Sequence, residues 1–175
     1  GVQTCALPIS TILANPNVSG SHSNSSDFAL YLLSENPKED YDVYFAGWDA
    51  SGNTGTGGVG IHHPSGDAKK IATHNIVPAS VETDRYWRVF WDATANGQSV
   101  TEGGSSGSPL FRANGRVIGQ LFGTFAGSNP NCSDPDNDNG DYGRLSYSWD
   151  NDGATDSRRR LRDHLDPVGL GATTD

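Results

Sequence analysis

TEGGSSGSP, residues 101–109, is the stretch from which the fold and the chemistry of this chain are inferred. It contains the pattern Gly-x-Ser-Gly-Ser-Pro, with Ser106 at its centre. A serine hydroxyl is a weak nucleophile, and it needs a neighbouring base and donors for the oxyanion that it creates. Small residues around Ser106 allow a sharp turn, in which the amides of Gly104 and Ser106 point at one spot. The alternative interpretation of the same residues is a flexible Gly/Ser loop.

The residues that follow favour a fixed turn over a flexible loop. Pro109 closes the pattern, and the apolar pair Leu110–Phe111 comes directly after it. Residues 115–123, GRVIGQLFG, are typical of a strand that returns beside the first. We therefore treat Ser106 as a candidate nucleophile held between two strands.

TEGGSSGSPLF followed by GRVIGQLFG resembles the nucleophile region of chymotrypsin-like (trypsin-fold) serine proteases. More narrowly, it is similar to bacterial lysyl endopeptidase-like secreted proteases. Four further stretches extend the resemblance, which covers the chain from about Ser26 to Pro167: SDFALYLL at 26–33, YDVYFAGWDASG at 41–52, GIHHPSGDAKKI at 60–71 and YGRLSYSW at 142–149.

Composition narrows the class of protein. The chain has 175 residues, with 12 Lys and Arg against 21 Asp and Glu, and a net charge of −9. This acidic balance argues against nucleic acid or an anionic membrane as a partner. The 22 glycines and the low charged fraction of 19% are typical of a loop-rich all-β extracellular domain. No apolar run is long enough to cross a membrane, so we expect a secreted, soluble monomer.

The first nine residues, GVQTCALPI, match the translation of a common sequencing adapter, and the chain contains no methionine. We therefore expect residues 1–9 to be a non-native adapter-derived segment, 10–167 a truncated trypsin-like protease domain and 168–175 a C-terminal tail. On this interpretation Cys5 is not native, and a Cys5–Cys132 disulfide is not expected. The resemblance implies instead that Cys132 pairs with a cysteine upstream of this chain.

Short strands with one helix indicate an all-β fold. The resemblance implies a chymotrypsin-like double β-barrel, present as the end of the first barrel and the second barrel, with a C-terminal α-helix. Residues 10–25 and 127–141 are expected to be loops, and Ser157–Asp166 the helix, ended by Pro167. Strands are expected at 28–33 (buried), 41–48, 59–63, 69–76, 86–91, 109–112, 116–125 and 142–149.

The resemblance assigns roles to several residues. Ser106 corresponds to the nucleophile that forms the acyl-enzyme, and the amides of Gly104 and Ser106 to the oxyanion hole. Asp27 corresponds to the triad aspartate, which holds the catalytic imidazole in the right tautomer. Without the resemblance, Asp27 would be interpreted as a turn residue before a strand. The implied function is hydrolysis of peptide bonds in a protein or peptide substrate, after Lys or Arg.

The histidine base is not found where the resemblance places it. In that family the histidine precedes the aspartate by tens of residues, within a Thr-Ala-(His/Ala)-His-Cys run that this chain lacks. His22 lies in a Ser/Asn loop and does not match this motif. His62 and His63 are expected to be structural, and His74 and His164 to lie at strand ends or on the surface. We therefore predict an inactive chain, with a non-catalytic protease homologue that acts as a binding module as the alternative function.

The resemblance also implies a primary specificity pocket. Asp141 is the candidate for its base, although the family aspartate corresponds to Gly140, one residue earlier. Phe122 and Gly123 would lie on the edge strand beside the substrate, with Thr101 on the opposing wall. The alternative is that Asp141 is one more solvated acid in its loop.

The loop from Asp134 to Asp141 faintly resembles a calcium loop. It lacks the glycine expected at the sixth position and an acid at the twelfth, which is Leu145. We therefore expect no metal and no cofactor. A calcium-stabilised adhesin-type β-domain is the weaker alternative, which only this loop favours.

Overall fold

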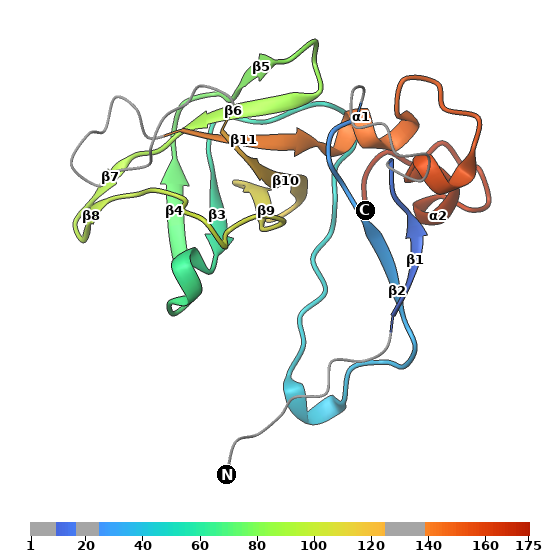
Figure 1. The fold of residues 1–175 in the computed structure, drawn as a ribbon, viewed down its shortest axis with the longest axis horizontal. Coiled ribbons are helices and arrows are strands. Elements are labelled where there is room, and N and C mark those ends of the chain that lie inside the picture. Colours follow the sequence, from blue (N-terminus) through green and yellow to red (C-terminus); the bar gives the residue numbers. More distant parts are fainter. Residues whose placement is uncertain (1–9, 17–24, 125–138) are drawn as a thin grey trace.

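A computed structural model describes residues 10–16, 25–124 and 139–175. Its main feature is one seven-stranded antiparallel sheet with the strand order β4-β3-β9-β10-β11-β6-β5 (Figure 1). The expected all-β class is confirmed. The strands of this sheet are β3 (Gly58–His62), β4 (Lys70–His74), β5 (Ala79–Val81), β6 (Tyr86–Phe90), β9 (Pro109–Arg112), β10 (Val117–Gly123) and β11 (Asn139–Arg144).

Smaller elements surround this sheet. Two hairpin-like pairs form sheets of their own: β1 (Ser10–Ala14) with β2 (Leu30–Leu33), and β7 (Ala93–Thr94) with β8 (Gly97–Gln98). Two short α-helices and three 3-10 turns complete the described elements: α1 (Leu145–Asp150), α2 (Arg162–Leu165), η1 (Glu39–Tyr41), η2 (Pro64–Gly66) and η4 (Ser157–Arg159). No helix of the described residues is long and apolar enough to cross a membrane.

The seven-stranded sheet is curled so that its two ends approach each other. In Figure 1, β5, β6 and β11 run across the view, whereas β3 and β4 run up and down it. The amide of Asp92, just after β6, donates to the carbonyl of Thr73 on β4 at 2.8 Å. This bond joins β4, at one end of the strand order, to the chain that leaves β6, the strand next to the other end. The sheet therefore surrounds a core as a barrel does.

Alternation along β6 supplies the aromatic part of that core. Trp87, Val89 and Trp91 share one face, as the sequence predicts, and all three are buried. Tyr142 enters from β11 and reaches across the interior, where a Cβ on Gly60 of β3 would lie 2.8 Å from its hydroxyl. Glycine at position 60 therefore leaves the space that this tyrosine fills. The remaining members of the cluster are Ala72, Leu110, Ile118 and Leu121.

A second cluster lies between the β1–β2 pair and the C-terminal helices. Phe28, Leu145 and Leu161 are buried in it, and Leu165 packs against it. The rings of Trp48 and Trp149 lie beside them with centroids 4.8 Å apart. Its other members are Ala14, Ala50 and Leu30.

Several expected boundaries are wrong. The strand expected at 142–149 is β11, which begins at Asn139 within the expected loop and ends at Arg144, after which α1 begins. The helix expected at Ser157–Asp166 is interrupted at Arg160, whose backbone is extended with φ −143° and ψ 152°. Helix propensity favours a continuous helix there. Instead, two short elements, η4 and α2, lie on either side of Leu161, which is buried in the second cluster.

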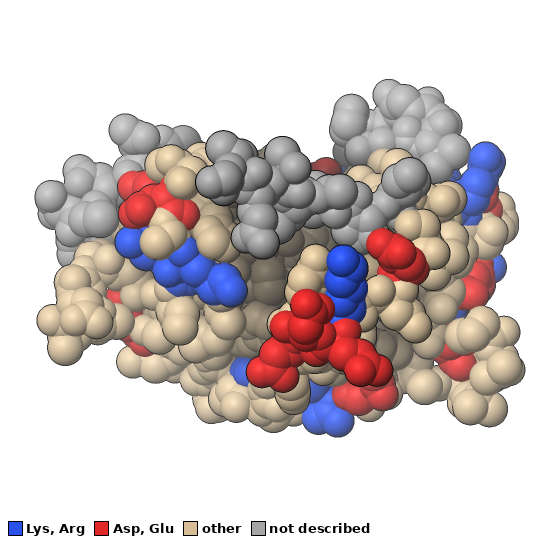
Figure 2. Space-filling view, turned by 90° about the horizontal axis from the view of Figure 1, so that it is seen from below, with Lys and Arg blue, Asp and Glu red and all other residues tan. Residues whose placement is uncertain are grey.

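The N-terminal third differs most from expectation. Residues 10–14 form a strand and not a loop, and the strand expected to be buried at 28–33 is β2, whose residues 31–33 are exposed. Residues 41–48 do not form the expected strand. Instead they belong to a protruding segment, in which Tyr44 is 90% exposed and Phe45 77%. Figure 2 shows the densest group of Asp and Glu side chains on the lower face, in the region where Figure 1 places η1 and the chain next to it.

Ser26 connects the N-terminal part to the sheet by close backbone packing. Its carbonyl accepts from Nε2 of Gln120 on β10 at 2.7 Å, and its hydroxyl lies 2.5 Å from that of Ser148 on α1. A Cβ on Gly143 of β11 would overlap both the Ser26 carbonyl oxygen and the Gln120 amide. Only glycine therefore fits at position 143.

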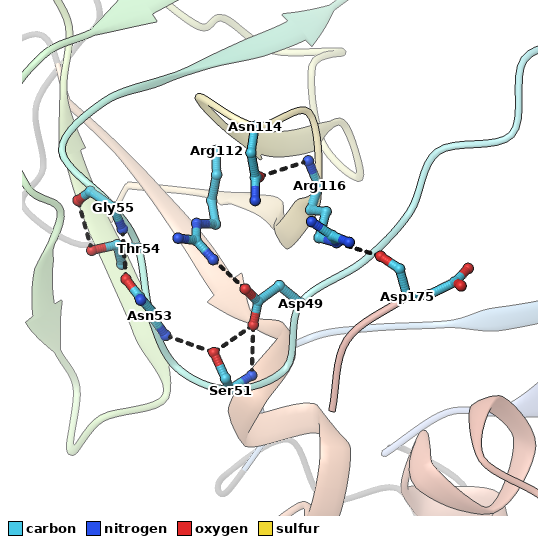
Figure 3. A network of polar contacts seen from close by, with 9 residues as sticks. All are labelled: Asp49, Ser51, Asn53, Thr54, Gly55, Arg112, Asn114, Arg116 and Asp175. Atoms are coloured by element: carbon cyan, nitrogen blue, oxygen red, sulfur yellow. Dashed lines mark hydrogen bonds and ion pairs between the residues drawn. The ribbon is translucent and has the colours of Figure 1, made fainter. Parts of the chain in front are cut away.

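A buried ion pair fixes the segment after residue 47 against the β9–β10 turn (Figure 3). Asp49 is 4% exposed, and its carboxylate accepts from Ser51 and from the guanidinium of Arg112. Burial opposes ionisation, but the hydrogen bonds from Ser51 and the charge of Arg112 together hold the pKa of Asp49 below its usual value. The last residues pair alongside, with the Asp175 amide donating to the Trp48 carbonyl at 3.0 Å.

We predict that Gly143→Ala lowers the free energy of unfolding by about 1–3 kcal/mol, because the added methyl group must displace the Ser26 carbonyl or Gln120. The measurement is urea unfolding followed by tryptophan fluorescence. Gly103→Ala is the matched control, since a Cβ there meets nothing within 4 Å. Equal unfolding midpoints for the two variants would refute this account of the packing.

We predict that Asp49→Asn lowers the free energy of unfolding by about 1–3 kcal/mol at pH 7, because the amide cannot balance the Arg112 charge. The pKa of Asp49 in the folded protein lies below the unfolded value of 3.8. The stability that its carboxylate contributes is therefore complete above the unfolded pKa and is lost as the pH falls from there through the folded pKa. The gap between the wild type and Asp49→Asn should therefore narrow below about pH 4.

Asp84→Asn is the control for this second prediction, because its carboxylate also pairs with an arginine, Arg144, but is 77% exposed. Exposed ion pairs contribute little, so Asp84→Asn should change the unfolding midpoint far less. A gap for Asp49→Asn that stays constant from pH 7 to pH 3 would contradict the assignment of a depressed pKa.

Candidate active site

Ser106 lies in a turn whose amides alternate between bonded and unbonded. The amide of Ser105 donates to the Glu102 carbonyl at 3.0 Å, and that of Gly107 to the Leu121 carbonyl on β10 at 2.8 Å. The amides of Gly104 and Ser106, one on each side of the Ser105 amide, donate to no acceptor within the described part of the chain. These are the two amides that the sequence assigns to the oxyanion hole.

The turn needs glycine at two points. Gly104 has φ +95° and Gly107 has φ +82°, both in the region that side chains strongly disfavour. Ser106 between them is exposed, whereas Ser105 is 1% exposed and points into the protein. The nucleophile candidate is therefore presented to solvent on a turn whose preceding residue is buried.

Asp27 is held next to this turn by its neighbours. The Ser26 carbonyl is bound by Gln120, as described above, and the Asp27 carbonyl accepts from the same Nε2 at 3.2 Å. The Tyr86 hydroxyl donates to the Ser25 carbonyl at 3.0 Å. Burial, followed by the negative charge of Asp27, raises the pKa of Tyr86 to about 12, so this hydroxyl keeps its proton at neutral pH. The backbone of Asp27 is left-handed, with φ 53°.

Asp27 and Ser106 both line one cavity of about 440 Å³. Its walls are largely apolar and come from the start of β2, from β10 and from the C-terminal helices. The structure thus brings together two residues that are 79 positions apart in the sequence. The other lining residues are Phe28, Ala29, Leu30, Tyr31, Gly107, Gln120, Leu121, Leu145, Leu161 and Leu165.

Among the described residues, no histidine lines this cavity. Nδ1 of His62 lies 2.9 Å from the hydroxyl of Ser105, so its hydrogen-bond partner is Ser105 and not Ser106. The other three contact backbone carbonyls: His63 that of Asp67, His74 that of Ile76 and His164 that of Ser157. His22 lies outside the described residues.

The residues expected to form the specificity pocket are only partly together. Asp141 pairs with Gly123 across the β10–β11 ladder, and the ring of Phe122 lies 5.4 Å from that of Tyr86. Thr101 lies near Gly140, the neighbour of Asp141, because a Cβ on Gly140 would be 3.5 Å from its hydroxyl. Asp134 and Asp138 of the faint calcium loop lie outside the described residues.

Asp141 already has a cationic partner. It is fully buried, and its two oxygens accept from Nε and a terminal nitrogen of Arg88 at 2.8 and 2.9 Å. This two-pronged hydrogen bond raises the pKa of Arg88 above its usual value. The sequence analysis missed Arg88. Alternation along β6 places it on the face opposite Trp87, but only the pairing of β6 with β11 shows which acid it meets.

Comparison with known proteins identifies the family of this chain. The family model of the lysyl endopeptidase C-terminal domain matches residues 5–144, a range that begins inside the segment 1–9 and ends with β11. A lysyl endopeptidase of Pseudomonas aeruginosa is 38% identical over 104 residues, which are 57% of this chain and 21% of the relative. The chain thus spans about a fifth of that relative's length.

Solved structures were also compared. Two structures of the inactive form of the Rv3671c protease of Mycobacterium tuberculosis, one of them a serine-to-alanine mutant, are similar in part. They are 21% and 22% identical to this chain with TM-scores of 0.44 and 0.43. Each covers 77% of the chain, which corresponds to 58% and 60% of the solved chains.

The family model matches well over half of the chain, and the matched range contains Ser106, Asp27 and the whole seven-stranded sheet. The chain therefore belongs to the lysyl endopeptidase C-terminal domain family.

Proposed function

We propose that Ser106 is the nucleophile of a serine endopeptidase, with the amides of Gly104 and Ser106 as its oxyanion hole. The observation that carries this proposal is the pair of unbonded amides on either side of the bonded amide of Ser105. Donors that are already oriented and unoccupied stabilise the charge that develops on a substrate carbonyl. In a flexible Gly/Ser loop, we would not expect the amides of Ser105 and Gly107 to be held by carbonyls while the amides of Gly104 and Ser106 have no acceptor.

In the proposed reaction, the Ser106 oxygen attacks the carbonyl carbon of a peptide bond, and its proton passes to a histidine base. The histidine then protonates the leaving amine, and water hydrolyses the acyl-enzyme by the same route in reverse. Asp27 would orient the imidazole, since it shares a cavity with Ser106. No metal or cofactor takes part in this scheme. We also propose that the protein acts as a monomer outside the cell.

The second candidate function is a peptide-binding module that keeps the fold without turnover. It is favoured by one observation, that the described residues place no histidine in the cavity shared by Asp27 and Ser106. The two functions differ in whether Ser106 becomes acylated once an imidazole is supplied.

We predict that the 175-residue chain does not hydrolyse peptide amides at a measurable rate, because loss of the triad base costs about six orders of magnitude in turnover. Added imidazole, a diffusible replacement for the base, should allow an activated ester to acylate Ser106, as detected by peptide mass spectrometry. Ser106→Ala is the control and should remain unlabelled.

One outcome would contradict the predicted inactivity of the chain, and another would contradict the proposed enzyme function. Efficient hydrolysis of amides without imidazole, lost in Ser106→Ala, would show that a histidine of the chain reaches Ser106. If Ser106 is not acylated even with imidazole while peptides bind, the binding module is the better account.

We propose further that Asp141 sets a preference for basic substrate side chains, in competition with Arg88. A buried carboxylate without a partner is costly, and in this structure Arg88 meets that need. A lysine side chain therefore has to displace Arg88 before it reaches Asp141. This arrangement predicts a weak preference in the wild type and a stronger one when Arg88 is removed.

The preference is testable with n-butylammonium as a mimic of the lysine side chain and n-butanol as its neutral analogue. Arg88→Gln should bind n-butylammonium at least about tenfold more tightly than the wild type, because the cation then no longer competes with the Arg88 guanidinium for the buried Asp141 carboxylate. The double variant Arg88→Gln/Asp141→Asn should lose this gain, and n-butanol should not distinguish the variants. A gain that persists in the double variant would exclude Asp141 as the carboxylate responsible.

A further inference from the structure

We infer that His62 is a positioning residue for the oxyanion hole and acts through the buried hydroxyl of Ser105, an inference that rests on the function proposed for Ser106. His62 is the last residue of β3 and is 3% exposed. Its Nδ1 lies 2.9 Å from the Ser105 hydroxyl, and Ser105 is 1% exposed. The reaction proposed above uses neither side chain, yet Ser105 stands between the two amides that form the hole.

The hydrogen bonds around Ser105 are compatible with a neutral His62 that carries its proton on Nε2. The Glu102 amide donates to the Ser105 oxygen at 3.3 Å, so that oxygen is an acceptor there. The single proton of the Ser105 hydroxyl remains available for Nδ1 of His62, which accepts it in the neutral tautomer with its proton on Nε2. Burial lowers the pKa of His62, although the charge of Glu102 opposes this, and the neutral form is thereby kept.

The chain that follows His62 holds the same loop at two further points. The amide of Ser65 donates to the Gly103 carbonyl at 2.7 Å, and its hydroxyl donates to the Glu102 carboxylate at 3.1 Å. A Cβ on Gly104 would lie 3.3 Å from both the His63 carbonyl oxygen and the Ser65 nitrogen. Residues 62–65 therefore pack directly against residues 102–105.

Peptide planarity converts these contacts into amide directions. A trans peptide places its N–H opposite its carbonyl, and the described chain contains no cis peptide. The Gly104 amide belongs to the peptide whose carbonyl, that of Gly103, is bound by Ser65. The Ser106 amide belongs to the peptide whose carbonyl, that of Ser105, accepts from the Ser108 amide at 3.1 Å. Because His62 anchors the Ser105 side chain, it fixes the orientation of both peptides.

His74 provides a matched control for this inference. It is a second buried histidine, 4% exposed, on the neighbouring strand β4. Its Nδ1 lies 3.0 Å from the Ile76 carbonyl, and within the described part of the chain it makes no hydrogen bond to residues 102–108. Replacement of His74 should therefore cost stability without a specific effect on the two amides.

The experiment compares His62→Leu, His62→Asn and His74→Leu in the full chain, isotopically labelled for amide NMR. Leucine removes the acceptor at the Nδ1 position, whereas the asparagine carbonyl replaces it. We expect the Gly104 and Ser106 amide signals to shift in His62→Leu, and hydrogen exchange at the Ser105 amide to rise at least about tenfold. His62→Asn should restore both, and His74→Leu should leave both as in the wild type.

Ser105→Ala gives a second route to the same result if His62→Leu does not fold. It removes the other half of the contact, so it should reproduce the shifts of the two amides. In addition, a fluorophosphonate probe with imidazole present should modify Ser106 at least about tenfold more slowly in His62→Leu than in His74→Leu, since a misaligned donor weakens the oxyanion hole.

The outcomes separate this inference from the proposed function. Unchanged Gly104 and Ser106 signals in both His62→Leu and Ser105→Ala would overturn the positioning role. Equal displacement of these signals by His62→Leu and His74→Leu would overturn it as well, because the effect would then reflect general loss of stability. If the amides respond as expected but the probe never modifies wild-type Ser106, the proposed function fails while the positioning of the amides by His62 holds.

Discussion

The structure depends on the enclosure of three large aromatic side chains by a curled sheet. Trp87 and Trp91 enter from β6, and Tyr142 crosses the interior until its ring edge reaches the backbone of Gly60. Because these rings are wide, the sheet bends around them until the chain that leaves β6 meets β4, where the Asp92 amide donates to the Thr73 carbonyl. Burial of this apolar area is the main favourable term in folding the sheet.

The site is a consequence of that enclosure. β9 begins at Pro109, three residues after Ser106, and is paired on both sides, by β3 and by β10. The turn that carries Ser106, the proposed nucleophile, is therefore attached to a strand inside the sheet, and η2 at the end of β3 also contacts this turn. Catalytic groups placed on rigid elements hold their geometry better than groups on free loops. The turn gains its rigidity from strands that are not themselves part of the chemistry.

The sequence allowed local features to be predicted where one short pattern determines them. Alternation in residues 86–91 identified the core face of β6, and the Pro-Ser-Gly-Asp turn identified the β3–β4 hairpin. The features that were missed depend on pairing between distant segments. Arg144 is the end of β11 because the chain beyond it must bury Leu145 in the second cluster, and the local sequence from Tyr142 onward does not reveal this.

The candidate site shows the same division. Ser106, Gly104 and Asp27 were assigned from motifs, and the structure places Ser106 and Asp27 on one cavity. The partners of Asp141 and Ser105 were not predictable. Asp141 lies on β11 and the partner of Ser105, His62, lies on β3, and the order of the whole sheet determines what these strands face. Arg88 is 53 residues from Asp141, and His62 is 43 residues from Ser105.

The exposed aromatic and aliphatic side chains of β2 and of residues 41–45 have a consequence for the behaviour of the protein in solution. Tyr44, Phe45 and Leu32 present apolar area to water on a molecule that carries a net charge of −9. Repulsion between such molecules opposes their association only within the Debye length, about 8 Å at physiological ionic strength. Added salt shortens this range and also strengthens apolar attraction when its anion is sulfate or phosphate. The colloidal stability of the protein is therefore greatest in dilute buffer and declines as salt is added.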